Sequence, residues 1–274
     1  MLNKRVISAI IGIPLLILIL HIGGILFLLT VLLLAALGLN EFYRLASAKG
    51  VRPNRSLGLL SGLFLLTVTY LNSKQLLIYF KPELIIISIL FLLLLNNLVG
   101  GKDQDKSALL DTAVTMLGIL YVCGLLLYLI LIYNFNLDGM QIGRKLVWLP
   151  ILATWMADTA AYFTGLNFGK HKLAPNISPN KTIEGALGGI AGSLLIVLIY
   201  GSWLSIGIKE RIVLGVLLAI VSQLGDLVES AFKRDAQIKD SGNIIPGHGG
   251  ILDRFDSLLF TLPLVYYYFQ FLVK

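Results

Sequence analysis

Charged residues are scarce in this chain of 274 residues. Only 14% are Asp, Glu, Lys or Arg, while 57% are hydrophobic. Ordinary soluble domains have about 25% charged residues and about 45–50% apolar ones. The scarcity of charge therefore excludes an ordinary soluble domain and predicts an integral membrane protein.

Cysteine is almost absent as well, and the chain has no Gly/Ser-rich linker, low-complexity tract or internal repeat. Cys123 is the only cysteine, which excludes a disulfide framework or a cysteine-rich metal site within one chain. Because Cys123 lies inside an apolar run, we interpret it as a small core residue rather than a reactive thiol.

Long apolar runs make up most of the chain. A bilayer core about 30 Å thick needs about 20 apolar residues of helix, so we predict an all-α, polytopic membrane protein with about nine transmembrane helices. The predicted spans are Val6–Leu20, Ile22–Leu45, Leu57–Leu71, Pro82–Val99, Ala108–Tyr133, Leu146–Leu166, Ile183–Ile206, Ile212–Phe232 and Ile251–Val273. Only residues 21–24 separate the first two runs, which indicates a tight helical hairpin. No small-residue cleavage site follows the first run, so we expect it to be retained rather than removed as a signal peptide.

The distribution of cations predicts the orientation. With the N-terminus in the cytoplasm and alternating sides, 15 of the 22 Lys and Arg residues fall on the inner side, as the positive-inside rule requires. The loops Asn167–Thr182 and Lys233–Gly249 then face the cytoplasm, where nucleotides are found. We interpret the net charge of +7 as attraction to anionic lipid headgroups and not to nucleic acid, because the charges flank apolar spans.

Carboxylates enter the predicted spans mainly in the C-terminal half. Asp158 lies in the middle of one span, and Asp226 and Glu229 share a helix face with Lys233 in another. A carboxylate at mid-bilayer costs at least about 2.5–3.5 kcal/mol, so it normally faces a polar cavity and marks a site or a pathway. The structural alternatives are an intramembrane salt bridge and a solvated helix end.

Polar residues also gather at the ends of the spans. Asp253 and Asp256 open the last span, where they would also suit a helix N-terminus. The segment "SPNKTIEG" brings two hydroxyls and a lysine to the start of a helix, which suits a phosphate chain. Its spacing is not that of a Walker A loop, and a plain helix cap by Thr182 is the simpler interpretation. In "PGHGG" the glycines let the backbone approach a ligand closely, and His248 is either a phosphate donor or an ordinary loop histidine.

These features together indicate phosphoryl or nucleotidyl transfer. Carboxylates on two or three helices can hold Mg²⁺, which takes few protein carboxylates and completes its shell with water and phosphate oxygens. Nearby cations neutralise the remaining phosphate charge. A proton-coupled transporter also needs membrane carboxylates, but it does not need a glycine-flanked basic loop beside them.

One segment resembles a known family signature. Residues 230–256 are similar to the signature of phosphatidate cytidylyltransferases (CDP-diacylglycerol synthases) at Ser230–Arg234, Lys239–Asp240, Gly242, Ile245–Pro246, His248–Gly250 and Asp253–Asp256. The similarity extends through the Asp158 span and the "SPNKTIEG" loop to the C-terminus. The N-terminal third matches only in its hydrophobic, multi-span character.

The resemblance implies the reaction CTP + phosphatidate → CDP-diacylglycerol + pyrophosphate in a polar, cytoplasm-facing cavity of a plasma (inner) membrane homodimer. It implies Mg²⁺ and allows a second cation. It divides the chain into N-terminal helices (1–80), a middle region that is a candidate for dimerisation (81–145) and a catalytic region (146–274). By similarity, catalytic roles go to Asp226, Asp253 and Lys233, and metal-binding roles to Asp226, Asp253, Asp256 and Asp158. Substrate-binding roles go to Ser178, Lys181, Thr182, Arg234, Lys239, His248 and Arg254.

Two other functions stay open on the residues alone. A CTP-dependent polyprenol or dolichol kinase would move the γ-phosphoryl group to a lipid alcohol and would need a base for that hydroxyl. A transporter would use Asp158 and Asp226 as a proton relay, and its uptake would not depend on CTP.

Overall fold

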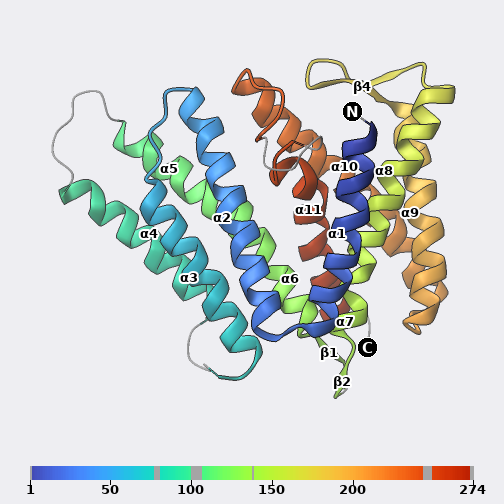
Figure 1. Cartoon of the computed structure of the whole chain (residues 1–274), viewed down its shortest axis with the longest axis horizontal. Coiled ribbons are helices and arrows are strands. Elements are labelled where there is room, and N and C mark those ends of the chain that lie inside the picture. The colour runs from blue at the N-terminus through green and yellow to red at the C-terminus, as the bar shows by residue number, and fades with distance from the viewer. Residues whose placement is uncertain (1, 77–80, 100–106, 138, 243–248, 272–274) are drawn as a thin grey trace. The chain divides into compact units, whose positions relative to one another are not determined.

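The computed structural model describes residues 2–76, 81–99, 107–137, 139–242 and 249–271, and Figure 1 shows its helices and strands. The helices are α1 (Leu2–Ile22), α2 (Gly24–Ala48), α3 (Arg55–Ser73), α4 (Pro82–Val99), α5 (Ala108–Gly118), the π-helical turn η1 (Ile119–Gly124), α6 (Leu125–Tyr133), α7 (Gly143–Leu146), α8 (Trp148–Phe168), α9 (Ile183–Trp203), α10 (Ile208–Asp235) and α11 (Leu252–Phe271). Two antiparallel hairpins pair β1 (Asn136–Leu137) with β2 (Met140–Gln141) and β3 (Lys172–Ala174) with β4 (Ser178–Thr182). The predicted all-α class is confirmed, with these two small hairpins as an addition.

Within the part of the chain that the structure describes, six helical segments are long and apolar enough to cross a membrane. They are Gly24–Ala48, Arg55–Ser73, Ala108–Tyr133, Gly143–Phe168, Ile183–Trp203 and Ile208–Asp235. Two shorter apolar segments are Ile10–Ile22 and Pro82–Leu98. Helix α11 has three charged residues among its first five and is not among the six. Each of the nine predicted spans coincides with helix in the described residues. The number that crosses the bilayer stays a prediction.

The chain divides into two compact units. The first comprises Met1–Leu131 and Asp235–Arg254, and the second comprises Ile132–Arg234 and Phe255–Lys274. The boundary passes through the first turn of α11. Asp253 therefore belongs to the first unit, while the other three predicted metal ligands belong to the second.

A buried tyrosine lies at the centre of the first unit. Tyr43 of α2 is fully buried, and its Oη donates a hydrogen bond to Thr115 O at 2.9 Å. A Cβ added at Gly58 of α3 or at Gly118 of α5 would overlap the Tyr43 side chain. These two glycines therefore allow α3 and α5 to pack directly on α2.

The π-helical turn η1 joins α5 to α6 without a break in the helix and contains Cys123. The thiol is fully buried, and a Cβ added at Gly62 would lie only 2.6 Å from its Sγ. The interpretation of Cys123 as a small core residue is confirmed. The predicted hairpin at the start of the chain is also confirmed, because α1 and α2 are joined at Gly23, whose φ of 66° suits glycine.

Glycines also bring the helices of the second unit into close contact. A Cβ at Gly192 of α9 would lie 2.7 Å from Met156 O of α8, and a Cβ at Gly215 of α10 would lie 2.9 Å from the Cα of Leu194. At Gly225 of α10 the nearest atom would be Asp256 O of α11, at 2.7 Å. The backbones of α10 and α11 therefore meet where each carries a carboxylate.

Candidate active site

Asp226 and Lys181 form an ion pair at one polar end of the second unit. Lys181 Nζ, from strand β4, lies 2.6 Å from Asp226 Oδ2 on α10. Ser230, one turn further along α10, donates to Asp226 Oδ1 at 3.3 Å. Both side chains of the pair are partly exposed, but the Lys181 Nζ atom itself is buried. The structure therefore brings together a predicted metal ligand and a predicted nucleotide-binding residue.

Lys233 forms an ion pair with Glu229, which lies one turn earlier on α10. Its ammonium group contacts Glu229 Oε2, and the Glu229 side chain is 1% exposed. This contact confirms that Glu229 and Lys233 lie on one helix face. For Glu229, the structure shows the salt bridge that the sequence analysis gave as an alternative to a functional site.

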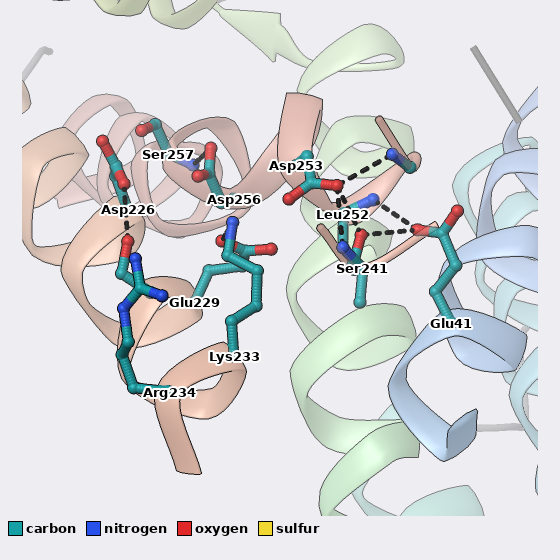
Figure 2. A network of polar contacts seen from close by, with 12 residues as sticks. Glu41, Asp226, Glu229, Lys233, Arg234, Ser241, Leu252, Asp253, Asp256 and Ser257 are labelled. Carbon is teal, nitrogen blue, oxygen red and sulfur yellow. Dashed lines mark hydrogen bonds and ion pairs between the residues drawn. The ribbon is translucent and has the colours of Figure 1, made fainter. Parts of the chain in front are cut away.

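Asp256 of α11 and Asp158 of α8 complete a group of carboxylates. Asp256 lies within electrostatic range of Asp226, of Asp158 and of the ammonium group of Lys233. Figure 2 shows Asp226, Asp256 and Lys233 beside one another. Asp256 also accepts a hydrogen bond from the backbone N–H of Ser257 at 2.6 Å. Three helices of the second unit thus contribute one aspartate each to this acidic group.

Hairpin β3–β4 is tied to α10 and to the start of α9. Arg234 Nε donates to Ile177 O at 3.1 Å, at the turn between the two strands. Glu184, in the first turn of α9, accepts hydrogen bonds from the backbone N–H groups of Lys170 and His171, and the ring Nδ1 of His171 lies 2.6 Å from it. The hairpin is therefore held at both ends, and Lys181 projects from it toward Asp226.

Thr182 acts as the N-cap of α9. Its Oγ1 accepts a hydrogen bond from Gly185 N at 3.1 Å, and the residue is buried. This is the helix cap that the sequence allowed as the simpler interpretation. Ser178 lies four residues away on β4 and is partly exposed.

A second polar network lies in the first unit. Asp253 Oδ2 accepts hydrogen bonds from Ser241 N at 2.9 Å, from Ser241 Oγ at 2.9 Å and from Gly250 N at 2.8 Å. Asp253 thus links both sides of the segment before α11. These hydrogen bonds give Asp253 a structural role at the start of α11.

Glu41 is the site residue that sequence reasoning missed. It lies on α2 with no exposed surface, and its carboxylate accepts hydrogen bonds from Ile251 N at 2.9 Å and Leu252 N at 2.8 Å (Figure 2). Ser241 Oγ lies 3.2 Å from Glu41 Oε2. The available signal was an isolated carboxylate in an apolar span, which is costly unless it is paired.

The signature glycines lie against this carboxylate. A Cβ added at Gly242 would overlap Glu41 Oε1, and one added at Gly250 would lie 2.5 Å from both oxygens of Glu41. At Gly249, whose φ is 83°, it would lie 2.7 Å from Asp253 Oδ2. These glycines therefore approach protein carboxylates, whereas the sequence analysis expected them to approach a ligand.

Two of the other predicted substrate-binding residues lie at the surface. Lys239 and Arg254 are exposed. His248 lies outside the described residues.

An exposed ion pair lies at the end of α10, where Lys49 Nζ is 3.0 Å from Asp235 Oδ1 and both side chains are exposed. Such an exposed pair contributes little to stability.

The donor set is suitable for a hard cation. Among the described residues, no three His, Cys, Asp or Glu side chains are arranged so that they could hold a metal ion, so the comparison with Mg²⁺ rests on the type of donor atom alone. The acidic group of Asp158, Asp226 and Asp256 consists of carboxylate oxygens, which are the ligands that Mg²⁺ prefers in proteins. The residues present therefore fit Mg²⁺ by their chemistry.

Known proteins are similar to this chain over almost its whole length. A sequence model described as "Cytidylyltransferase family" matches residues 3–272. A phosphatidate cytidylyltransferase of Synechocystis sp. is 37% identical, with 97% of this chain and 96% of that protein aligned. Proteins of the same name from Staphylococcus haemolyticus and Bacillus subtilis are 36% and 34% identical, with 95% and 97% of this chain and 96% of each relative aligned. The chain belongs to the cytidylyltransferase family.

Proposed function

We propose that this chain is a CTP:phosphatidate cytidylyltransferase, which transfers CMP from CTP to phosphatidate and releases pyrophosphate. The observation that carries the proposal is the group of three aspartates on α8, α10 and α11 with Lys181 and Lys233 beside it. Family membership over residues 3–272 supports it.

The reaction needs no general base on the acceptor. A phosphate monoester has a second pKa of about 6, so phosphatidate is largely dianionic at neutral pH. One of its oxygens attacks the α-phosphorus of CTP, the bond between the α-phosphorus and the bridging oxygen breaks, and pyrophosphate leaves with the electron pair. The protein has to reduce the repulsion between two anions and stabilise the leaving group.

We assign the cation-binding role to Asp226 and Asp253, with Asp256 and Asp158 as further ligands. Mg²⁺ would supply charge stabilisation to the phosphate oxygens, and a second cation is part of the proposal. Asp226, Asp253 and Lys233 are the catalytic residues of this assignment.

Lys181, Lys233 and Arg234 would bind phosphate oxygens. In the structure each already has an acceptor: Asp226, Glu229 and Ile177 O, respectively. These contacts fix the direction of each cation before the substrate arrives. A phosphate would have to displace Asp226 to reach the ammonium group of Lys181, which is buried in the structure. The other proposed substrate-binding residues are Ser178, Lys239, His248 and Arg254, while Thr182 is assigned to the cap of α9.

The membrane setting is part of the proposal. Nine helices would span the plasma membrane, with the N-terminus and the catalytic cavity on the cytoplasmic side and the acyl chains left in the bilayer. The protein would act as a homodimer, with residues 1–80 as N-terminal helices, residues 81–145 as a candidate dimerisation region and residues 146–274 as the catalytic region.

The test is to follow both ends of CTP. Purified protein in detergent is incubated with phosphatidate, Mg²⁺ and CTP labelled at either the α- or the γ-phosphate. We expect the α-label in lipid and the γ-label in pyrophosphate, with no transfer after EDTA is added. A γ-label in lipid with free CDP would replace the proposal with a lipid kinase. CTP-independent solute uptake by proteoliposomes, without any transfer, would replace it with a transporter.

A further inference from the structure

Glu41 is a buried carboxylate in an otherwise apolar helix. It lies on α2, a segment long and apolar enough to cross a membrane, and its exposed fraction is 0%. A charged side chain at such a position is expensive and is normally paired or functional. The contacts of Glu41 show what it is paired with.

The partners of Glu41 are the first N–H groups of α11. A helix start leaves about four backbone N–H groups without an acceptor inside the helix, and it carries a partial positive charge. Glu41 Oε1 accepts from Ile251 N at 2.9 Å, and Oε2 accepts from Leu252 N at 2.8 Å. A side chain of α2 therefore caps the start of α11, with one oxygen for each donor.

The same carboxylate is connected to Asp253 by one intermediate. Ser241 Oγ lies 3.2 Å from Glu41 Oε2 and 2.9 Å from Asp253 Oδ2. Asp253 is also the residue directly after Leu252, whose N–H group Glu41 holds. Glu41 thus acts on Asp253 through the hydroxyl of Ser241 and through the first turn of α11.

We propose that Glu41 is a positioning residue of the cytidylyltransfer reaction: by capping α11 and holding Ser241, it keeps Asp253 in the orientation in which Asp253 acts. The proposal rests on the proposed function and on the assignment of Asp253. It predicts that a carboxylate is required, because two backbone donors face two oxygens. A glutamine has the same size but one oxygen, and its amide N–H₂ group would face one of the two donors.

The experiment compares Glu41→Gln, Glu41→Asp and Ser241→Ala in purified full-length protein. Glu83→Gln is the matched control, because Glu83 is an exposed glutamate in the first turn of α4, in the same unit. Three quantities are measured: amide hydrogen exchange at Ile251 and Leu252, turnover with CTP and phosphatidate, and the Mg²⁺ concentration for half-maximal turnover.

We expect Glu41→Gln to accelerate exchange at the two amides at least about tenfold and to lower turnover by about 10- to 100-fold, the range for residues that orient a metal ligand. Half-saturation by Mg²⁺ should rise several-fold, which a simple loss of folded protein would not cause. Glu41→Asp keeps both oxygens and should recover part of the turnover. Glu83→Gln should match the wild type.

Several outcomes would overturn the inference. Wild-type turnover and Mg²⁺ dependence in Glu41→Gln would contradict it. Fully additive effects of Glu41→Gln and Ser241→Ala on turnover would also contradict it, because two residues that act through one contact should be coupled. If Glu41→Gln does not fold, wild-type turnover and Mg²⁺ dependence in Ser241→Ala would have the same consequence. A wild-type protein without transfer activity would instead contradict the proposed function, and the amide exchange would still test the cap.

Discussion

Lys181 Nζ lies 2.6 Å from Asp226 Oδ2, and this ion pair joins strand β4 to α10. The two residues were assigned different roles from the sequence, one to the nucleotide and one to the metal. Their contact means that each also sets the direction of the other before any ligand binds.

Replacing Lys181 with alanine should weaken CTP binding more than it slows the reaction. Charge-assisted hydrogen bonds are worth about 1.5–3 kcal/mol, so we expect the KM for CTP to rise by roughly 10- to 100-fold with a smaller change in kcat. Steady-state kinetics with varied CTP measures this. Lys172→Ala, an exposed lysine on β3 of the same hairpin, is the control, and an unchanged KM in Lys181→Ala would contradict the assignment.

Removing the charge of a predicted metal ligand should abolish most of the activity. For Asp226→Asn and Asp253→Asn we expect turnover to fall at least about 10³-fold, equivalent to about 4 kcal/mol, because a hard cation requires the negative oxygen. The variants should stay folded. Near-wild-type turnover at an unchanged Mg²⁺ half-saturation would rule out the metal assignment.

Asp253 allows its two roles to be separated. Asparagine keeps one oxygen that can accept the hydrogen bonds from Ser241 and Gly250, whereas alanine keeps none. We expect Asp253→Asn to have a near-wild-type melting temperature in detergent, and Asp253→Ala to lose about 1–3 kcal/mol of stability as well as activity, because it leaves buried donors without an acceptor. Equal stability of the two variants would mean that these hydrogen bonds contribute little.

Thr182 should behave as a helix cap. Thr182→Val removes the acceptor for Gly185 N and should cost about 1 kcal/mol of stability, while Thr182→Ser keeps the acceptor and should be close to the wild type. The KM for CTP should change less than about threefold in both. A KM that rises more than tenfold in Thr182→Val at unchanged stability would favour direct nucleotide contact.

Two glycine-to-alanine changes in the first unit should have opposite effects. A Cβ at Gly242 would overlap Glu41 Oε1, and overpacking of this kind costs about 1–3 kcal/mol. At Gly12 of α1 no atom lies within 4 Å of an added Cβ, so Gly12→Ala should be neutral or stabilise by about 0.5–1 kcal/mol. Denaturation in mixed micelles measures both. A stable Gly242→Ala protein would show that the segment moves away from Glu41 without cost.

Cysteine labelling tests the proposed orientation. In a Cys123→Ala background, Asn180→Cys should react with a membrane-impermeant reagent only when the inner face is accessible, and Lys209→Cys should react in intact cells. Both positions are exposed in the structure. The reverse pattern would place the candidate active site on the outer side.

The helices could be predicted from the sequence because bilayer thickness imposes long apolar runs. The run Pro82–Val99 coincides with α4, and Ala108–Tyr133 coincides with α5, η1 and α6 together. Helix α10 is longer at both ends than the predicted Ile212–Phe232, since a helix can continue past the apolar part into water. The hairpin β3–β4 was not predicted, because β3 has only three residues and the sequence of β4, "SPNKT", has no apolar alternation.

The candidate site was predicted where neighbours in the chain are also neighbours in space. The pair Glu229–Lys233 follows from helical spacing. The contact of Lys181 with Asp226 and the cap of α11 by Glu41 join residues that are far apart in the chain, so no local pattern contains them. The contact of the signature glycines with Glu41 could not be predicted for the same reason, since this carboxylate lies on α2.

The cap of α11 by Glu41 also has a consequence for the order of events during biosynthesis. Glu41 and Leu252 are 211 positions apart, and a chain emerges from the ribosome N-terminus first. Helix α2 is therefore made, and can enter the bilayer, long before Ser241, Ile251 and Leu252 exist. Until these three residues are made, the Glu41 carboxylate lacks their hydrogen-bond donors, and a polar group without partners is costly to place in lipid. The start of α11 thus supplies the partners of a carboxylate that is made much earlier, and a chain truncated before residue 241 would lack them.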